Sequence, residues 1–180
     1  MAPELEVRDP LDETLARLDG IAAPVDQQMD ALEDRIVSEL APVEMPLRHQ
    51  WTPGLYTRII FMPKGTLLTS KVHKTEHPYF VLSGIAKVFT EVGGWELMVA
   101  PRAGVTLPYT RRALCIHEDC LWATVHAITP EEEAEPDEAK RLAMIEARIM
   151  EVPRPEVHKR YLQLLDGLVG GSAVLAEEAF

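Results

Sequence analysis

The chain has 180 residues, of which 47% are hydrophobic and 26% charged, and its formal net charge at pH 7 is -11. These proportions are typical of a globular protein with one main domain, and the surplus of acidic residues argues against binding to the phosphates of nucleic acids. No apolar run is long enough to cross a bilayer, and the start, MAPELEVRDP, lacks the basic and apolar parts of a signal peptide. We therefore expect a cytoplasmic protein that binds neither nucleic acid nor membrane.

The charge is unevenly distributed along the chain. Residues 41–129 contain nine Lys and Arg against six Asp and Glu, whereas the two flanks together contain nine against 23. We divide the chain into an N-terminal helical extension (1–42), a main domain (43–129), and an acidic linker with C-terminal helices (130–180). A mildly basic domain is compatible with a small anionic ligand inside it, although acidic helices with an ordinary solvated surface would give the same pattern.

Two amphipathic helices are predicted in the first extension, over residues 11–22 and 26–40. Asp26 can cap the second helix, and Pro42 stops it. The apolar stripe of this helix consists of Met29, Leu32, Ile36 and Leu40. Both helices are too short to be stable alone, so we expect them to pack on the outer face of the main domain or on a partner chain.

The main domain is predicted to consist of short strands separated by Pro and Gly. Their evenly spaced runs indicate a mainly β fold, either a sandwich or a closed barrel. A hairpin turn is expected at residues 92–94. The predicted strands cover residues 57–62, 66–73, 79–84, 86–92, 95–100, 104–108, 111–117 and 121–128.

The third part begins with an acidic stretch, residues 131–138, which is predicted to be exposed and to form in part the acidic first turn of a helix. Helices are expected over residues 137–151 and 156–168, and residues 171–180 are expected to form a frayed tail. Cys115 and Cys120 do not have zinc-site spacing and are predicted to be free thiols.

Two histidines, His73 and His77, lie between Gly65 and Gly84 among residues that favour extended structure. Imidazole is a good ligand for Zn, Fe, Ni or Cu. In extended chain the two rings can converge on one point only if a turn folds the chain back between them.

This segment resembles the first motif of the cupin superfamily, which runs Gly, five residues, His-x-His, three or four residues, Glu, six residues, Gly. In that frame His73 occupies the second histidine position and His77 the glutamate position, while Lys71 replaces the first histidine. The resemblance implies a cupin-type jelly-roll β-barrel, here with N- and C-terminal α-helical extensions.

The segment from Gly104 to Asp119 resembles the second cupin motif. Pro108 matches the motif proline, but Arg111 or Arg112 stands where the family has a metal-binding histidine. A guanidinium has no lone pair for a metal, so this ligand is missing.

The resemblance implies a divalent transition metal (Zn, Fe, Ni or Mn) on His73, His77 and a third ligand. We choose His117 as the third ligand, although strand alternation from Arg112 turns it outward unless a bulge intervenes. The alternatives are His49, Glu118 and His126, and His126 is better explained as a plain strand histidine. His158 is predicted at the surface.

A small anionic ligand is expected to contact Lys71, Arg58 and Arg112, with Tyr79 as a pocket wall, because guanidiniums bind carboxylates and phosphates in two-point contact. Alternatively, Arg111 or Arg112 pairs with Glu118 or Asp119, and Lys71 is a rim residue. Whether the protein is an enzyme is left open. The rival function is a non-catalytic ligand-binding or assembly module without a metal, and the amphipathic helices suggest a homodimer.

Overall fold

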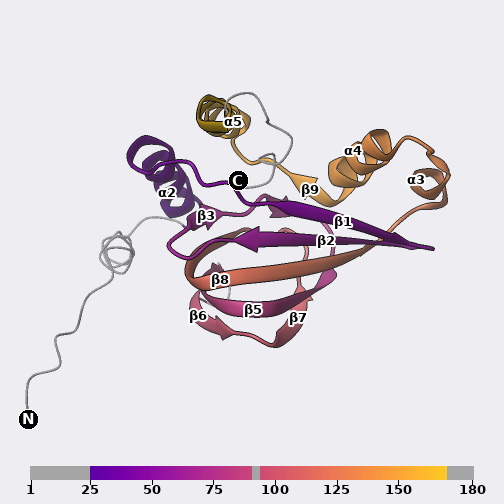
Figure 1. Ribbon diagram of the computed structural model, residues 1–180, viewed down its shortest axis with the longest axis horizontal. Helices are drawn as coiled ribbons and strands as arrows, with labels where there is room; N and C mark the ends of the chain where they lie inside the picture. Colours follow the sequence, from indigo (N-terminus) through magenta and orange to yellow (C-terminus); the bar gives the residue numbers. More distant parts are fainter. Residues whose placement is uncertain (1–24, 91–93, 170–180) are drawn as a thin grey trace, which may run out of the picture.

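The computed structural model describes residues 25–90 and 94–169 (Figure 1). The predicted helix over residues 11–22, the turn around residues 92–93 and the tail 171–180 lie outside these ranges. Within them the fold is mainly β, as predicted, with helices on both sides of the β region in the sequence.

Most strands belong to one antiparallel sheet with the order β1-β2-β8-β5-β6, in which β3 pairs with β8 and β7 pairs with β5. The sheet curves strongly, and the helices lie on its upper side in Figure 1. A second, two-stranded sheet joins β4 to β9. The strands are β1 (Leu47–Thr52), β2 (Leu55–Met62), β3 (Leu67–Thr69), β4 (Val72–His73), β5 (His77–Thr90), β6 (Gly94–Val99), β7 (Arg102–Thr106), β8 (Arg112–Ala127) and β9 (Met150–Glu151).

Two of the strands are longer than predicted. The runs 79–84 and 86–92 form the single strand β5, and the runs 111–117 and 121–128 form β8. The register between these two strands shifts between Val81 and Ala86. An irregularity of this kind bends a strand without ending it. The residues that were predicted to separate two strands therefore lie inside the continuous strands β5 and β8.

Two glycines allow close approach between strands. Gly84 has a φ of +85°, and a Cβ at this position would lie 2.2 Å from the carbonyl oxygen of Asp119. At Gly104 a Cβ would lie 2.6 Å from the hydroxyl oxygen of Tyr79. Any larger residue at either position would have to displace backbone or a buried ring.

Helix α2 (Val25–Glu39) shares the main core with residues of the inner face of the sheet, so it does not pack on the outer face as predicted. Three residues of the predicted stripe, Met29, Leu32 and Ile36, enter the main core together with Val37. The fourth, Leu40, was predicted wrongly: it follows the last residue of the helix and is exposed. Glu33 is buried, and it accepts a hydrogen bond from the Thr69 hydroxyl (2.8 Å) and forms an ion pair with Arg111. Arg111 therefore pairs with α2 rather than with Glu118 or Asp119.

The acidic stretch after the sheet is exposed and partly helical, as predicted, except that Glu132 is buried and Glu135 half-buried. Residues Pro130–Ala134 form helix α3, whose capping box joins Thr129 to Glu132. The Glu132 side chain is buried and accepts a hydrogen bond from Arg148 Nε at 2.7 Å. The acidic residue is tolerated because its carboxylate has both a helix cap and a guanidinium as partners.

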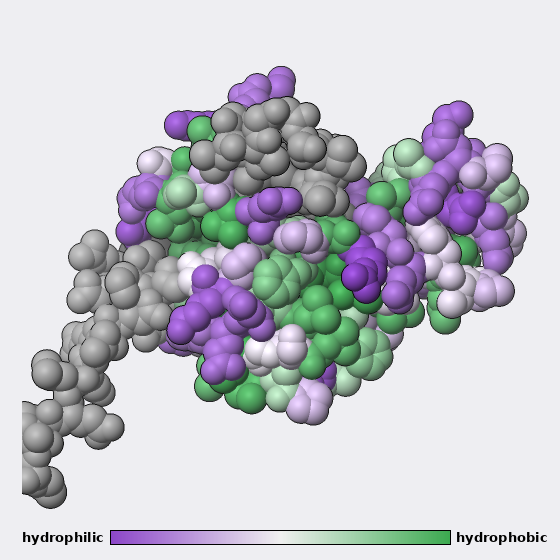
Figure 2. Space-filling model, in the orientation of Figure 1, coloured by the Kyte–Doolittle hydropathy of each residue, from purple (hydrophilic) through white to green (hydrophobic). Residues whose placement is uncertain are grey.

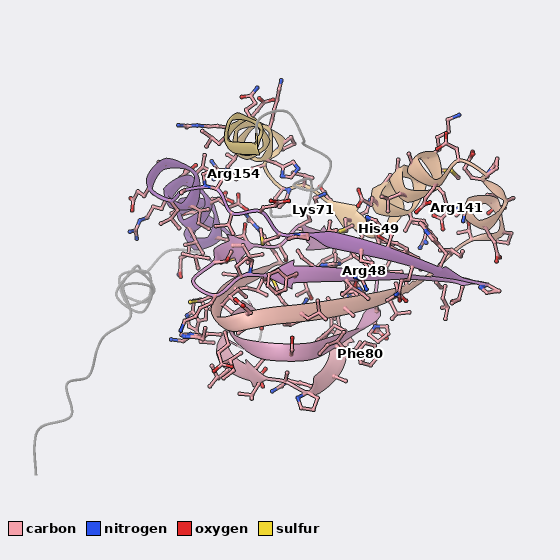
Figure 3. The ribbon with its side chains drawn as sticks, in the orientation of Figure 1. Arg48, His49, Lys71, Phe80, Arg141 and Arg154 are labelled. Atoms are coloured by element: carbon pink, nitrogen blue, oxygen red, sulfur yellow. The ribbon has the colours of Figure 1, made fainter. Side chains whose placement is uncertain are left out.

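The two C-terminal helices agree with prediction except at one boundary. Helix α4 spans Glu138–Ile149 and α5 spans Pro155–Val169. Met150 and Glu151 were predicted to continue α4 but form β9 against β4. Arg154 fixes the start of α5 to α2 by donating to the Asp30 carbonyl (2.7 Å) and the Asp34 carboxylate (2.8 Å) (Figure 3).

Cys115 and Cys120 are not joined in a disulfide, as predicted, and both are buried. Burial raises the pKa of the Cys120 thiol to about 11, which keeps it protonated at neutral pH. Among the described helices, none combines the length and the apolar character needed to span a bilayer.

Candidate functional site

A cavity of about 80 Å³ lies on the inner face of the curved sheet, where β2, β8 and the β3–β4 segment meet β9. Its wall contains both cationic or polar side chains and apolar ones. The lining residues are Arg58, Ile60, Met62, Leu68, Ser70, Lys71, His73, Arg112, Leu114, Trp122, Thr124 and Met150.

Three cationic side chains reach this cavity. Arg58, Lys71 and Arg112 are 8%, 8% and 7% exposed. Within the described part of the chain, no acidic residue is among those that line the cavity. Burial lowers the pKa of Arg58 and of Arg112, but a guanidinium stays protonated in proteins, so both remain cationic at neutral pH. The cavity is therefore strongly electropositive.

Arg112 is held by neutral partners. One guanidinium nitrogen, Nη2, donates to the Thr106 hydroxyl at 2.9 Å, and the guanidinium lies 5.3 Å from the centre of the Tyr79 ring. Its Nε is buried and finds no hydrogen-bond partner among the described residues. Arg58 donates from Nη1 to the Met150 sulfur at 3.0 Å, which connects the sheet to β9.

Three imidazole rings meet beside the cavity. The ring centroids of His73 and His77 lie 4.5 Å apart, and those of His77 and His126 lie 4.3 Å apart. The rings of His73 and His126 are nearly parallel at 6.4 Å. The turn between β4 and β5 brings the first two together, and β8, which pairs with β5, supplies the third.

Each ring has a buried nitrogen without a hydrogen-bond partner among the described residues: His73 Nδ1, His77 Nε2 and His126 Nδ1. His77 Nδ1 lies 3.0 Å from the Thr75 carbonyl oxygen, which can only accept, so this nitrogen carries the proton. His77 Nε2 therefore presents a lone pair, the tautomer of a metal-binding histidine.

The rings are neutral at physiological pH. Burial, followed by the charges of His77, Arg58 and Arg112, lowers the pKa of His73 well below 6.5. Burial also lowers the pKa of His77, and burial with the charges of His77, Arg58 and Arg148 lowers that of His126 to about 3. Metal ligation requires neutral imidazole, so the protonation state fits a transition metal.

The arrangement of the rings does not match this chemistry fully. Across residues 25–90 and 94–169, no group of three or more His, Cys, Asp or Glu side chains is arranged so that it could hold a metal ion. The donor atoms and their protonation are those that a transition metal needs, but their arrangement in the structure is not that of a metal site.

The structure places most of the predicted site residues around this cavity. Arg58, Lys71, Arg112 and His73 line it, and Tyr79 lies beneath the Arg112 guanidinium. His77 joins His73 in the imidazole cluster. His117 is not in the ring contacts of that cluster: it lies nine residues before His126 on β8, roughly 30 Å of extended chain away.

Two residues near the cavity were given little weight or none from the sequence. His126 follows Trp122 and Thr124 at intervals of two residues, and this alternation was the available signal that it shares their inward face. Nothing in the sequence indicated that Met150 would line the cavity, because the predicted helix over residues 137–151 includes it. His158 was predicted at the surface, but its ring is partly buried, and burial with the nearby Lys71 charge lowers its pKa to about 4.

No protein-family model and no curated protein sequence matches the chain. Solved structures similar to it include KdgF from Halomonas sp., at 16% identity and a TM-score of 0.41 over 50% of this chain and 85% of that chain. Another is an RmlC-like cupin from Shewanella frigidimarina, at 13% identity and a TM-score of 0.41 over 51% and 82%. A third is an acetylacetone dioxygenase from Acinetobacter johnsonii, at 18% identity and a TM-score of 0.39 over 46% and 59%.

Proposed function

We propose that this chain is a cupin-type jelly-roll protein that binds a small anionic molecule in the cavity of its curved sheet. The two motif segments support the cupin assignment, because Gly84 and Gly104 lie where the neighbouring backbone or ring leaves no room for a Cβ. The function is supported by one observation above all: the buried Arg112 guanidinium reaches the cavity with a partly unsatisfied set of donors.

A buried cation is costly unless an opposite charge or hydrogen bonds compensate it. The Thr106 hydroxyl and the Tyr79 ring supply part of that compensation for Arg112. An anion in the cavity would supply the remainder and would also interact favourably with the charges of Arg58 and Lys71. These charges attract anions, so they favour an anionic ligand over a neutral one of the same size.

The proposal is tested by thermal unfolding of the full chain with sodium acetate or inorganic phosphate at constant ionic strength. A ligand at a hundred times its Kd adds about 2.7 kcal/mol to the free energy of unfolding, so the unfolding temperature should rise. The rise should be lost in Arg112→Met and kept in Arg48→Met, which removes an exposed arginine from β1. Equal rises in the wild type, Arg112→Met and Arg48→Met would contradict the proposal. Arg112→Lys keeps the positive charge but cannot make the two-point contact of a guanidinium, so it should give an intermediate rise.

A divalent transition metal on His73, His77 and His126 is the second candidate. It is favoured by the unpartnered buried nitrogen on each of these neutral rings. Zn, Fe, Ni or Mn would act there as a Lewis acid beside the anion. Elemental analysis of protein purified without a histidine tag should find metal that is lost in His126→Phe and retained in His117→Phe.

Absence of metal from the tag-free protein, together with intact anion binding, would favour the rival function, a non-catalytic ligand-binding module. This outcome would leave the anion site unaffected.

We further propose that the protein forms a homodimer through the outer face of its sheet. Phe80 and Leu82 of β5 and Val105 of β7 are exposed there, and Figure 2 shows hydrophobic surface gathered over this part of the sheet. With a net charge of -11, two copies repel each other unless they meet through an uncharged face. A standard interface needs about 800 Å² from each partner, so neighbouring strands must contribute as well.

Light scattering of the full chain at micromolar concentration tests the homodimer. We expect twice the chain mass of 20.2 kDa for the wild type and for Leu164→Glu, which changes an exposed leucine of α5. Leu82→Glu should give the monomer mass. A wild-type monomer would contradict the proposal.

A further inference from the structure

The composition of the cavity wall indicates which class of anion it takes. Half of the lining side chains are apolar: Ile60, Met62, Leu68, Leu114, Trp122 and Met150. The other half are cationic or polar, and two of these already use their side-chain oxygens: Ser70 accepts from the Arg112 backbone amide, and Thr124 contacts the His126 ring. Among the described residues of this wall, Arg112 has a buried donor, Nε, without a hydrogen-bond partner.

We infer that the ligand is a small carboxylate with an apolar body, and not a phosphate or sulfate; this inference rests on the proposed anion-binding function. A carboxylate carries its charge at one end, where Arg112 can meet it, and its hydrocarbon part can lie against the apolar half of the wall. A phosphate or sulfate has oxygens on all sides. Several of these would face apolar side chains and lose their hydrogen bonds to water without replacement.

The volume of the cavity limits the size of this carboxylate. A dry cavity of about 150 Å³ takes one benzene molecule, which has six carbon atoms. A cavity of about 80 Å³ is roughly half as large. We therefore expect a body of only a few carbon atoms, in the range of propionate and butyrate, and we expect benzoate to be excluded.

Met150 is the residue that sets this limit. It comes from β9 rather than from the main sheet, it is buried, and it lies against Arg58 at the cavity wall. A methionine side chain is long and unbranched, so its removal enlarges the cavity without disturbing the ladder of the main sheet. The C-terminal segment would thus determine ligand length, while the sheet residues determine ligand charge.

The experiment is calorimetric titration of the full chain with sodium acetate, propionate, butyrate, benzoate, phosphate and sulfate at pH 7 and constant ionic strength. Each added methylene should tighten binding about fourfold until the cavity is full. Phosphate and sulfate should bind at least tenfold more weakly than the best carboxylate. Met150→Ala should move the optimum to a longer carboxylate, and the matched control Met144→Ala, at an exposed position of α4, should not.

The outcomes separate this inference from the anion proposal. If phosphate or sulfate binds as tightly as butyrate and depends on Arg112, the carboxylate inference is wrong and the anion site stands. If no anion binds, or if binding is unchanged in Arg112→Met, both are wrong. If the carboxylate length that binds most tightly is the same in Met150→Ala as in the wild type, only the role of Met150 is contradicted. Met150→Leu conserves the side-chain volume, so the preferred length should not change in this control.

Discussion

The ring of His77 on β5 lies 4.3 Å from the ring of His126 on β8. The two strands pair side by side, so the contact is fixed by the main sheet and not by a loop. With His73 they form a buried cluster in which a proton on one ring would face the other two rings and the charge of Arg58. Protonation of any of these rings is therefore disfavoured in the folded chain.

The first prediction concerns the pH dependence of stability. The pKa of His126 is about 3 in the folded chain and 6.5 as a free group, so the unfolded chain binds protons more strongly. Stability is complete above pH 6.5 and is lost as the pH falls from 6.5 toward 3. His126 alone should cost about 2 kcal/mol between pH 7.5 and pH 5, and the lowered pKa values of His73 and His77 add to this loss.

Urea denaturation between pH 7.5 and pH 5 measures this loss. His126→Phe keeps an aromatic ring but removes one titrating group, so its stability should fall less steeply with pH than that of the wild type. Identical slopes for the two proteins would show that His126 does not titrate in this way.

The second prediction concerns Gly84. Its Cβ would meet the Asp119 backbone, and its positive φ adds strain to any other residue. Gly84→Ala should therefore cost more than about 3 kcal/mol of the free energy of unfolding. Gly54→Ala is the matched control, because Gly54 also has a positive φ but open space around its Cβ, and it should cost only about 1 kcal/mol. Equal losses in urea denaturation would contradict the close approach of the strands at Gly84.

The third prediction concerns the attachment of α2. Glu33 is buried between Thr69 and Arg111, so Glu33→Gln should leave the Arg111 charge undercompensated and cost about 3 kcal/mol. Glu39→Gln alters an exposed pair with Arg35 and should cost less than about 1 kcal/mol. Hydrogen exchange should show the loss in Glu33→Gln concentrated in α2, and uniform loss over the sheet would argue against a local anchor.

The fourth prediction concerns the segment that was expected to be a linker. Glu132 joins the Thr129 capping box to Arg148 of α4, so Glu132→Ala should cost about 2 kcal/mol. The neighbouring Glu131 is exposed in the same helical turn, and Glu131→Ala should change the free energy of unfolding by less than about 0.5 kcal/mol. Chemical denaturation that fails to distinguish the two variants would mean that the Arg148 contact contributes little.

The mainly β fold and the helices α2, α4 and α5 could be predicted from the sequence because their signals are local. Apolar periodicity defined the inward stripe of α2, and the glycine spacing identified the segment with His73 and His77. The lengths of β5 and β8 could not be predicted in the same way, because the irregular register around Gly84 bends the strands where the sequence suggests a break.

The cavity was predictable only in part, for a different reason. Lys71 was predicted from strand alternation with His73, Arg112 from its position in the second motif segment, and Arg58 from its guanidinium alone. In the structure Lys71 lines the cavity from the segment between β3 and β4, where strand alternation does not apply. The meeting of His126 with His77 depends on the pairing of two distant strands, and the position of Met150 depends on where α4 ends. Such non-local contacts leave little trace in any single stretch of sequence.

The short ladder between β4 and β9 makes a segment that follows the main sheet part of the cavity wall. Because Met150 lines the cavity together with side chains of β2 and β8, substitutions after residue 129 would change its shape while every strand of the main sheet stays the same. A fragment cut after Thr129 would lack β9 and with it the Met150 part of this wall. Ligand screens made with such a fragment would therefore test a cavity of different shape.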